Sequence, residues 1–321
     1  MHLADIGVSP SATEGFCRLA ELDRHGEHRL SADAGAADVV LFSDLHLLPH
    51  DIGLRTLRRH ELYRRFPEKC FVYDERDHPW SNLPGLYVSM PGRTFDDRRQ
   101  VASAYYVLIR PAVPEVALPQ HLFSFLGSRS HPLRSKVLDL HHSRAVIEDT
   151  TGFVFYAAAS DDQHRERYAT VLADSKFVLC PRGAGTASIR LFETLAAGRV
   201  PVILSDGWVP PPGPDWDAIS VRWPEDDLAG LPAHLESRET QWPQLATGTR
   251  AAFDTWFAQD VSWHRLAEGL ASLVSAGVVG GFGPSVLNRP RWEAELVHAR
   301  WCTRSHLRSA VNALGGLGSR K

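Results

Sequence analysis

Short apolar runs alternate with amphipathic segments along this chain, a pattern that predicts an α/β fold with parallel strands. The clearest unit lies within residues 175–206. Residues 177–180 form an apolar run that is too short for a helix, and Pro181 closes it, so the run predicts a buried strand. A helix with one apolar face and a second strand at 200–204 follow. Strand, helix and strand in this order make a βαβ unit, the connection that parallel strands require.

The same pattern divides the chain into an α/β first half at 1–118, an α/β second half at 119–285, and a C-terminal segment at 286–321. In the first half we expect helices at 11–22 and 54–66 and strands at 37–42, 70–73, 86–90 and 105–109. Prolines at 110–120 predict an interdomain linker. The second half predicts further strands at 121–126, 151–158 and 219–223 and helices at 132–140, 165–173 and 241–274, and the C-terminal segment predicts a helix at 292–314.

The turn at 181–188 lies at the carboxyl end of a strand and opens a helix. Its glycines allow a ligand to approach the backbone closely, and free N–H groups with the helix dipole favour an anion. Arg182 and Arg190 add guanidinium groups suited to phosphate oxygens, and Glu193 can accept hydrogen bonds from sugar hydroxyls. The pattern indicates a phosphate-bearing small molecule, although a strand–turn–helix connection without a ligand fits the glycine turn equally well.

Residues 177–211, FVLCPRGAGTASIRLFETLAAGRVPVILSDGWVPP, resemble the core of the exostosin family of glycosyltransferases. The matching positions are Pro181, Arg182, Gly183, Ser188, Arg190, Glu193, Ala197, Gly198, Pro201, Val202, Ile203, Ser205 and Asp206. Upstream, SFLGSRSHPLR at 124–134 resembles the segment that opens the family's donor half. The likeness covers about residues 120–260.

The resemblance implies a GT-B-like fold, in which two Rossmann-like domains face a central cleft. It implies an inverting glycosyltransferase that uses a nucleotide-diphosphate sugar, with a UDP-sugar favoured. The first half would hold the acceptor and the second half the donor, and the C-terminal helix would cross back to the first half. The donor-binding residues would be Gly127, Arg134, Arg182, Gly183, Ser188, Arg190, Glu193 and Asp206.

An inverting enzyme of this kind needs a base that takes the proton of the acceptor hydroxyl. In a two-domain layout the base is expected from the first half, where polar residues follow two predicted strands. Asp77 is our first candidate and Asp44 our second; the other candidates are His46, Asp74, Glu75 and His78. The alternative explanation of the charged segment at 74–79 is a local salt-bridged turn.

Metal chemistry is not expected. The adjacent histidines at 141–142 point to different faces and lack a Cys or carboxylate at zinc spacing, and the paired aspartates at 161–162 and 226–227 lack the Asp-x-Asp spacing that holds a metal against a diphosphate. We therefore predict a metal-independent reaction with no cofactor besides the nucleotide sugar. Arginines and the helix dipole would stabilise the departing diphosphate.

The composition of the chain limits which binding partners and which cellular location we expect. A net charge of −3 and a pI near 6.6 give no general nucleic-acid footprint, and the four cysteines are far apart, which favours buried thiols over a disulfide framework. No apolar run approaches the ~20 residues that span a bilayer, and the start resembles no signal peptide. We predict a cytoplasmic protein, for which peripheral membrane association is possible. The excess of arginine over lysine favours a bacterial source.

The acceptor is open between a glycan, a lipid-linked glycan and a small molecule. Two alternatives to an enzyme are an inactive sugar-nucleotide-binding protein and a scaffold subunit of a polysaccharide-assembly complex. Donor hydrolysis or transfer would separate an enzyme from both.

Overall fold

A computed structural model describes residues 1–7, 10–48, 50–79, 83–107, 114–151 and 162–282 of the chain. It contains two five-stranded sheets, and every strand pair in them is parallel. Four short 3-10 helices supplement the elements described below: η1 (Leu45–Leu47), η2 (Pro67–Lys69), η3 (Gly92–Thr94) and η4 (Glu239–Gln241). The predicted parallel α/β class is confirmed.

The first sheet keeps its strands in the order in which they occur along the chain. The strands are β1 (His2–Ala4), β2 (Val40–Phe42), β3 (Cys70–Asp74), β4 (Gly85–Tyr87) and β5 (Gln100–Ala102). The helices between them are α1 (Pro10–Leu22), α2 (His50–Arg59) and α3 (Glu61–Arg65). Successive side chains of a strand point to opposite faces, so Leu41 joins one hydrophobic core with Phe16, while Val40 joins another with Leu57.

The second sheet has the order β10-β9-β8-β6-β7, so the direction of strand addition reverses between β6 and β8. Its strands are β6 (His121–Gly127), β7 (Ala145–Asp149), β8 (Ser175–Pro181), β9 (Val200–Leu204) and β10 (Val221–Arg222). Its helices are α4 (Pro132–Leu138), α5 (Asp162–Ala173), α6 (Ile189–Ala196), α7 (Trp216–Ile219), α8 (Leu231–Arg238) and α9 (Trp242–Trp256). With its strands numbered 1 to 5 along the chain, this sheet has the order 2-1-3-4-5, which is the doubly wound order of flavodoxin-like folds.

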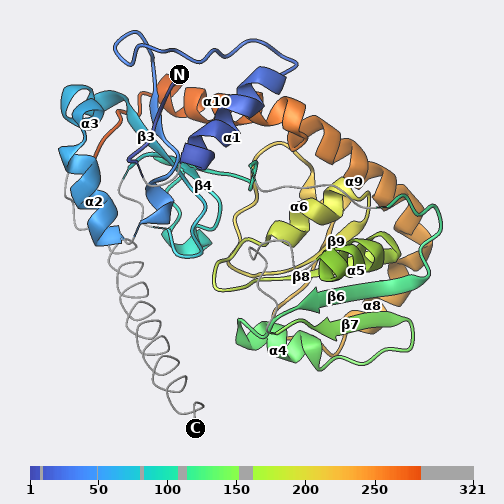
Figure 1. The fold of residues 1–321 in the computed structure, drawn as a ribbon. Coiled ribbons are helices and arrows are strands. Elements are labelled where there is room, and N and C mark those ends of the chain that lie inside the picture. The colour runs from blue at the N-terminus through green and yellow to red at the C-terminus, as the bar shows by residue number, and fades with distance from the viewer. Residues whose placement is uncertain (8–9, 49, 80–82, 108–113, 152–161, 283–321) are drawn as a thin grey trace.

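The last described helix, α10 (Gln259–Ser275), follows the second sheet in the chain but packs against α1, β4 and β5 of the first (Figure 1). Trp263 is completely buried, and its indole N–H donates to the carbonyl of His28 at 3.0 Å. Beyond the helix, the amides of Gly280 and Gly281 donate to the carbonyls of Glu68 and Cys70. The chain therefore returns to the first half well before residue 286.

One hydrophobic core joins the two halves. It contains Tyr73 and Leu86 of the first sheet, Val178 and Phe192 of the second half, and Trp263 of α10. Since side chains from both sheets share this cluster, separating the halves would expose apolar surface on each, which costs about 25 cal/mol per Å².

Several element boundaries differ from the prediction. Tyr105–Val107 are not in a strand, and the strand of that region is β5; residues 108–109 lie outside the described part. The expected helices at 54–66 and 241–274 are each divided, at His60 and at residues 257–258. Strands β1 and β7 were not predicted. The predicted strand at 151–158 lies almost wholly, and the helix at 292–314 completely, outside the described residues.

Candidate functional site

The switch in strand order between β6 and β8 brings together the loops that follow these two strands. Ligands of open parallel sheets bind outside the carboxyl ends of the strands at such a switch. Arg134 comes from α4, directly after β6, and Arg182 follows the last residue of β8. Gly127 is the last residue of β6. The strand order thus brings three of the predicted donor-binding residues to one edge.

Arg134 lies over the 181–183 turn. Its Nε donates to the carbonyl of Arg182 at 3.2 Å, and its other nitrogens donate to Ser130 Oγ and to the carbonyl of Pro181. Burial, and next the positive charge of Arg190, lower the pKa of Arg134 to about 10; the carboxylate of Asp77 acts in the opposite direction. A guanidinium whose charge is poorly compensated attracts an anion.

Arg182 adds a second guanidinium to the same edge. Its Nη2 donates to the carbonyl of Ala184 at 3.1 Å. The pKa values of His78 and His131 are lowered, first by burial and also by the positive charge of Arg182. His78 belongs to the first half, so the field of Arg182 reaches across to it.

Arg190 is the most enclosed of the three arginines. Only 8% of it is exposed, its guanidinium lies 4.6 Å from the centre of the Phe125 ring, and it donates to the carbonyl of Leu126. Its Nε is buried and has no hydrogen-bond partner among the described residues. An unused buried donor is costly, so this N–H is a candidate contact for a ligand oxygen.

Glu193 lies one turn further along α6 and is also buried. Its carboxylate accepts a 2.6 Å hydrogen bond from the hydroxyl of Tyr168, and burial raises its pKa although Tyr168 and Arg190 act against this. Glu193 is therefore a buried carboxyl group and not a solvated charge on the surface of α6. It supports Arg190 from within the protein.

Two glycines leave room for the arginines. A Cβ at Gly127 would lie 2.6 Å from Phe125 and 3.2 Å from Nη2 of Arg190, and a Cβ at Gly183 would lie 3.2 Å from Nη2 of Arg134. Neither glycine has a positive φ, so the backbone conformation does not require glycine at either position. The close packing of neighbouring side chains does.

The first half meets this turn at its own carboxyl edge. A Cβ at Gly185 would lie 2.7 Å from Oδ1 of Asp77 and 2.9 Å from Oγ of Ser89. The hydroxyl of Thr186 donates to the carbonyl of Ser89 at 2.9 Å, and the amide of Ala187 donates to the hydroxyl of Ser89 at 3.3 Å. Asp77, which is exposed, thus lies beside the turn that carries Arg182.

Ser89 is the residue of this contact that sequence reasoning missed. Its hydroxyl also lies 3.3 Å from the hydroxyl of Tyr105, and either can donate. A single serine after a strand carries no recognisable signal, so only the approach of the two halves reveals its part in fixing the turn.

The other candidate bases are held in internal contacts. Asp44 is completely buried and accepts the amide hydrogen of Ile6. The remaining contacts involve the carboxylate of Asp74 with Arg76 at 3.5 Å and the carboxylate of Glu75 with His46 at 3.2 Å and Tyr73 at 3.2 Å. Asp77 is the carboxylate of this group that is exposed and next to the turn.

The two remaining predicted residues have local contacts. Ser188 is the N-cap residue of α6, but its side chain makes no capping hydrogen bond. Asp206 is exposed, and its Oδ1 accepts the amide of Glu225 at 3.3 Å while its own amide donates to the Glu225 carboxylate at 2.9 Å. These contacts fit an Asp206 that orients its loop.

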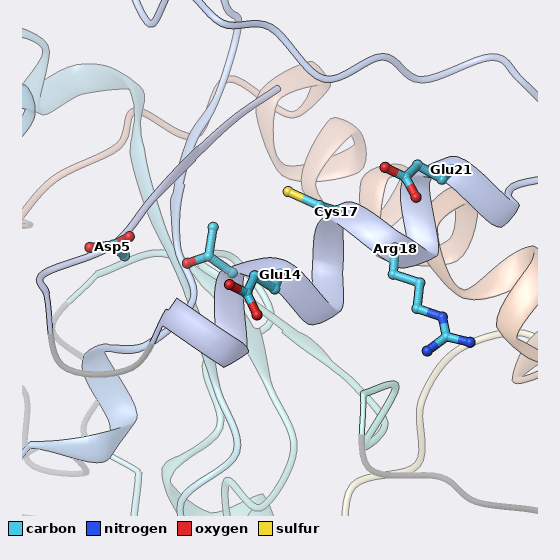
Figure 2. A pocket seen from close by; sticks show the side chains of 6 residues that line it. Asp5, Glu14, Cys17, Arg18 and Glu21 are labelled. Carbon is cyan, nitrogen blue, oxygen red and sulfur yellow. The ribbon is translucent and has the colours of Figure 1, made fainter.

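A hollow of about 560 Å³ lies beside α1, and none of the candidate-site residues lines it (Figure 2). It is lined by Asp5, Thr13, Glu14, Cys17, Arg18 and Glu21. Carboxylates outnumber the arginine in this lining, so it suits a polyphosphate poorly.

The predicted thiols and membrane behaviour can also be compared with the structure. Cys70 and Cys180 are buried thiols, as predicted, and burial raises the pKa of each to about 12. Within the described residues, no helix combines the length and the apolar character needed to cross a bilayer.

The fold and the site define a parallel α/β protein with a cationic turn at the switch point of its second sheet. Residues 91–237 match the family model described as the Exostosin GT47 domain. The chain is 34% identical to an Exostosin-1 homolog of Caenorhabditis elegans over 112 residues, which are 33% of this chain and 29% of the relative. It is 45% identical to Exostosin-1c of Danio rerio over 171 residues, 48% and 23% of the two chains. It is 38% identical to a probable glycosyltransferase of Arabidopsis thaliana over 72 residues, 22% and 14% of the two chains.

This chain is therefore exostosin-like over the matched segment, and the resemblance to that glycosyltransferase family is confirmed. The family match begins at residue 91, earlier than the expected start near 120, and it includes both loops of the candidate site. The chain spans less than a third of the length of each relative named above. These relatives come from animals and a plant, so a bacterial source stays a prediction, as does the cytoplasmic location.

Proposed function

We propose that this chain is an inverting glycosyltransferase that moves a sugar from a nucleotide diphosphate to a hydroxyl group of a glycan, lipid-linked glycan or small molecule. The observation that carries the proposal is the position of Asp77 beside the turn that bears Arg182, with Arg134 bound across the same turn. A base and a diphosphate site must lie this close together for direct displacement at a sugar carbon. The exostosin-like match over residues 91–237, which includes Arg134 and Arg182 but not Asp77, supports the donor side of the proposal.

In the proposed reaction, the carboxylate of Asp77 takes the proton of the acceptor hydroxyl. The acceptor oxygen forms a bond to the anomeric carbon while the bond from that carbon to the diphosphate oxygen breaks. The electron pair leaves with the nucleoside diphosphate, and the configuration at the carbon inverts. A positioned base contributes about 10²–10⁴-fold to such a step.

The arginines would stabilise the departing diphosphate. Arg134 and Arg182 offer guanidinium N–H groups, Arg190 has a buried Nε without a described partner, and the start of α6 adds oriented amides. Fixed positive groups in a site with little water stabilise charge that develops in the transition state. We propose that these groups take the place of a metal at the diphosphate.

The two halves would divide the substrates. We propose that the second sheet, with Gly127, Gly183, Ser188, Glu193 and Asp206 around the arginines, binds the donor. The first sheet would bind the acceptor on the side of Asp77. We favour a UDP-sugar because the resemblance favours it.

Calorimetry and turnover on the same sample test this function. UDP and GDP are titrated into the full chain, and release of nucleoside diphosphate from the corresponding sugar nucleotides is measured with and without EDTA. We expect UDP to bind more tightly than GDP, and an initial rate at about 25 °C that EDTA does not change. Nucleotide binding without turnover would favour an inactive sugar-nucleotide-binding protein. The absence of nucleotide binding would favour a scaffold subunit. A large loss of rate in EDTA would contradict the metal-independent reaction.

A further inference from the structure

A cluster of possible metal ligands lies where the loop after α1 meets α10. His25, Glu27 and His264 each offer one ligand atom, and these atoms all lie within 4.8 Å of one another. Two of the residues follow α1 and the third belongs to a helix more than 200 positions later. None of them belongs to the proposed donor site.

One member of the cluster has an unused buried nitrogen. His264 is 4% exposed, and its Nδ1 is buried without a hydrogen-bond partner among the described residues. Its Nε2 lies 3.4 Å from the carboxylate of Glu268. A histidine that binds a metal commonly has its second nitrogen held by a carboxylate in this way. A buried nitrogen without a hydrogen bond is costly, and a metal would remove that cost.

The protein holds the ligands close together through other contacts. The imidazole of His25 stacks on that of His264, with ring centres 3.9 Å apart and planes 11° apart, and the ring centre of His28 lies 5.2 Å from that of His264. The amide of Arg24 donates to the carbonyl of Asp260 at 2.9 Å. Trp263 anchors the same loop through the carbonyl of His28. The loop is therefore fixed on α10 without a metal, so little ordering of the backbone is required. Because the lone pairs of an imidazole lie in its ring plane and the two stacked planes are nearly parallel, the exposed ring of His25 would have to rotate for both histidines to reach one ion.

We propose that His25, Glu27 and His264 bind a divalent transition metal ion of the Zn²⁺ class. Two imidazoles and one carboxylate form a ligand set that zinc accepts with a fourth position for water or another ligand, whereas Mg²⁺ and Ca²⁺ prefer oxygen ligands alone. The ion would join the loop after α1 to α10 and thereby hold the returning helix on the first sheet. Its role would be structural, and the proposed reaction would not depend on it.

The test titrates Zn²⁺ into metal-free full-length chain by calorimetry, with Mg²⁺ as the comparison ion. We expect one Zn²⁺ site and no comparable Mg²⁺ site. In Zn²⁺ at about 100 times the dissociation constant, the melting temperature should rise by about 5 °C. The double variant His25→Ala, Glu27→Gln should lose this site and the rise, and because both residues are exposed it should still fold.

The matched control is His141→Ala, which removes an exposed histidine that has a histidine neighbour but lies elsewhere. It should bind Zn²⁺ as the original chain does. The proposal is overturned if the original chain shows no saturable Zn²⁺ binding, or if the double variant binds one Zn²⁺ with unchanged affinity. Neither result bears on nucleotide binding, so this proposal and the proposed function fail separately.

Discussion

The two sheets of this protein are both parallel and five-stranded, but they differ in strand order. The first runs β1 to β5 without reversal, whereas the second reverses between β6 and β8. The loops after β6 and β8 diverge from that reversal, and the arginines of the candidate site lie on them or on the helices that follow. The second sheet thus gathers three arginines at one edge through its own topology.

The first sheet contributes in another way. Its strands β3 and β4 end in loops that place Asp77 and Ser89 against the 185–187 turn of the second half. In the proposed reaction, the charge that stabilises the leaving group comes from the second sheet, while the proton acceptor and the hydrogen bonds that support the turn come from the first. Substitutions in the two sheets should therefore have different consequences.

The largest expected effect comes from the first sheet. Asp77→Asn keeps the shape of the side chain but removes the proton acceptor, so the rate of transfer should fall about 10²–10⁴-fold. Nucleotide affinity should stay within a factor of about 2, because the arginines are unchanged. Calorimetry and product release measure the two quantities. The control is Asp97→Asn, an exposed carboxylate of the first half, and equal activity in both variants would remove Asp77 as the base.

The next effect comes from the second sheet. Arg134→Ala removes hydrogen bonds to a charged ligand, each worth about 1.5–3 kcal/mol, so the affinity for UDP should fall roughly 10- to 100-fold. The control is Arg129→Ala, on the loop that precedes α4, where the guanidinium is paired with Asp139 and Asp149. Isothermal titration of both variants checks this, and matching affinities would contradict a diphosphate contact of Arg134.

A third substitution tests the contact between the sheets. Gly185→Ala would place a methyl group 2.7 Å from Oδ1 of Asp77 and 2.8 Å from its Cα, so we expect a loss of about 1–3 kcal/mol in the free energy of unfolding. Nucleotide affinity should fall with it as the turn shifts. The control is Gly248→Ala, within helix α9. Its new Cβ would lie 3.5 Å from the side chain of Ile219, an ordinary van der Waals distance, so the variant should be as stable as the original chain or more stable. Denaturant unfolding of both variants decides; equal stability would mean that the sheets are not in contact at this turn.

The smallest expected effect concerns the pH dependence of stability. Burial raises the pKa of Glu193, so between the usual and the raised pKa the folded chain keeps a proton that the unfolded chain has lost. The free energy of unfolding therefore falls as the pH rises through this window. Glu193→Gln should remove that contribution, so the variant should gain stability relative to the original chain as the pH rises above the usual pKa of a glutamate, about 4.3. Thermal melts at several pH values measure it, and the exposed Glu166→Gln should show no such gain.

The sequence predicted the βαβ unit of β8, α6 and β9 because a compact apolar run, a proline–glycine turn and a glycine stop occur in order. It missed β1, which has only three residues, and β7, whose side chains are mostly half-buried and do not read as an apolar run. The sequence also did not predict that α10 packs against the first sheet, because the apolar face of a helix does not indicate which sheet it covers.

In the candidate site, too, residues in local patterns were predicted, and contacts between distant segments were not. Arg182 and Arg190 were predicted from the turn after a strand and from the family pattern, and Arg134 from the family pattern alone; the structure brings all three to one edge. The burial of Asp44 and the contact of Ser89 with Thr186 depend on how distant segments meet, and no local pattern encodes that.

The return of α10 has a consequence for limited proteolysis. The halves are linked covalently twice, once between β5 and β6 and again where α9 passes into α10. If a protease cuts either link, the two fragments should stay associated through the shared hydrophobic core around Trp263. Such a nicked molecule should elute from a sizing column as one particle and come apart only in denaturant.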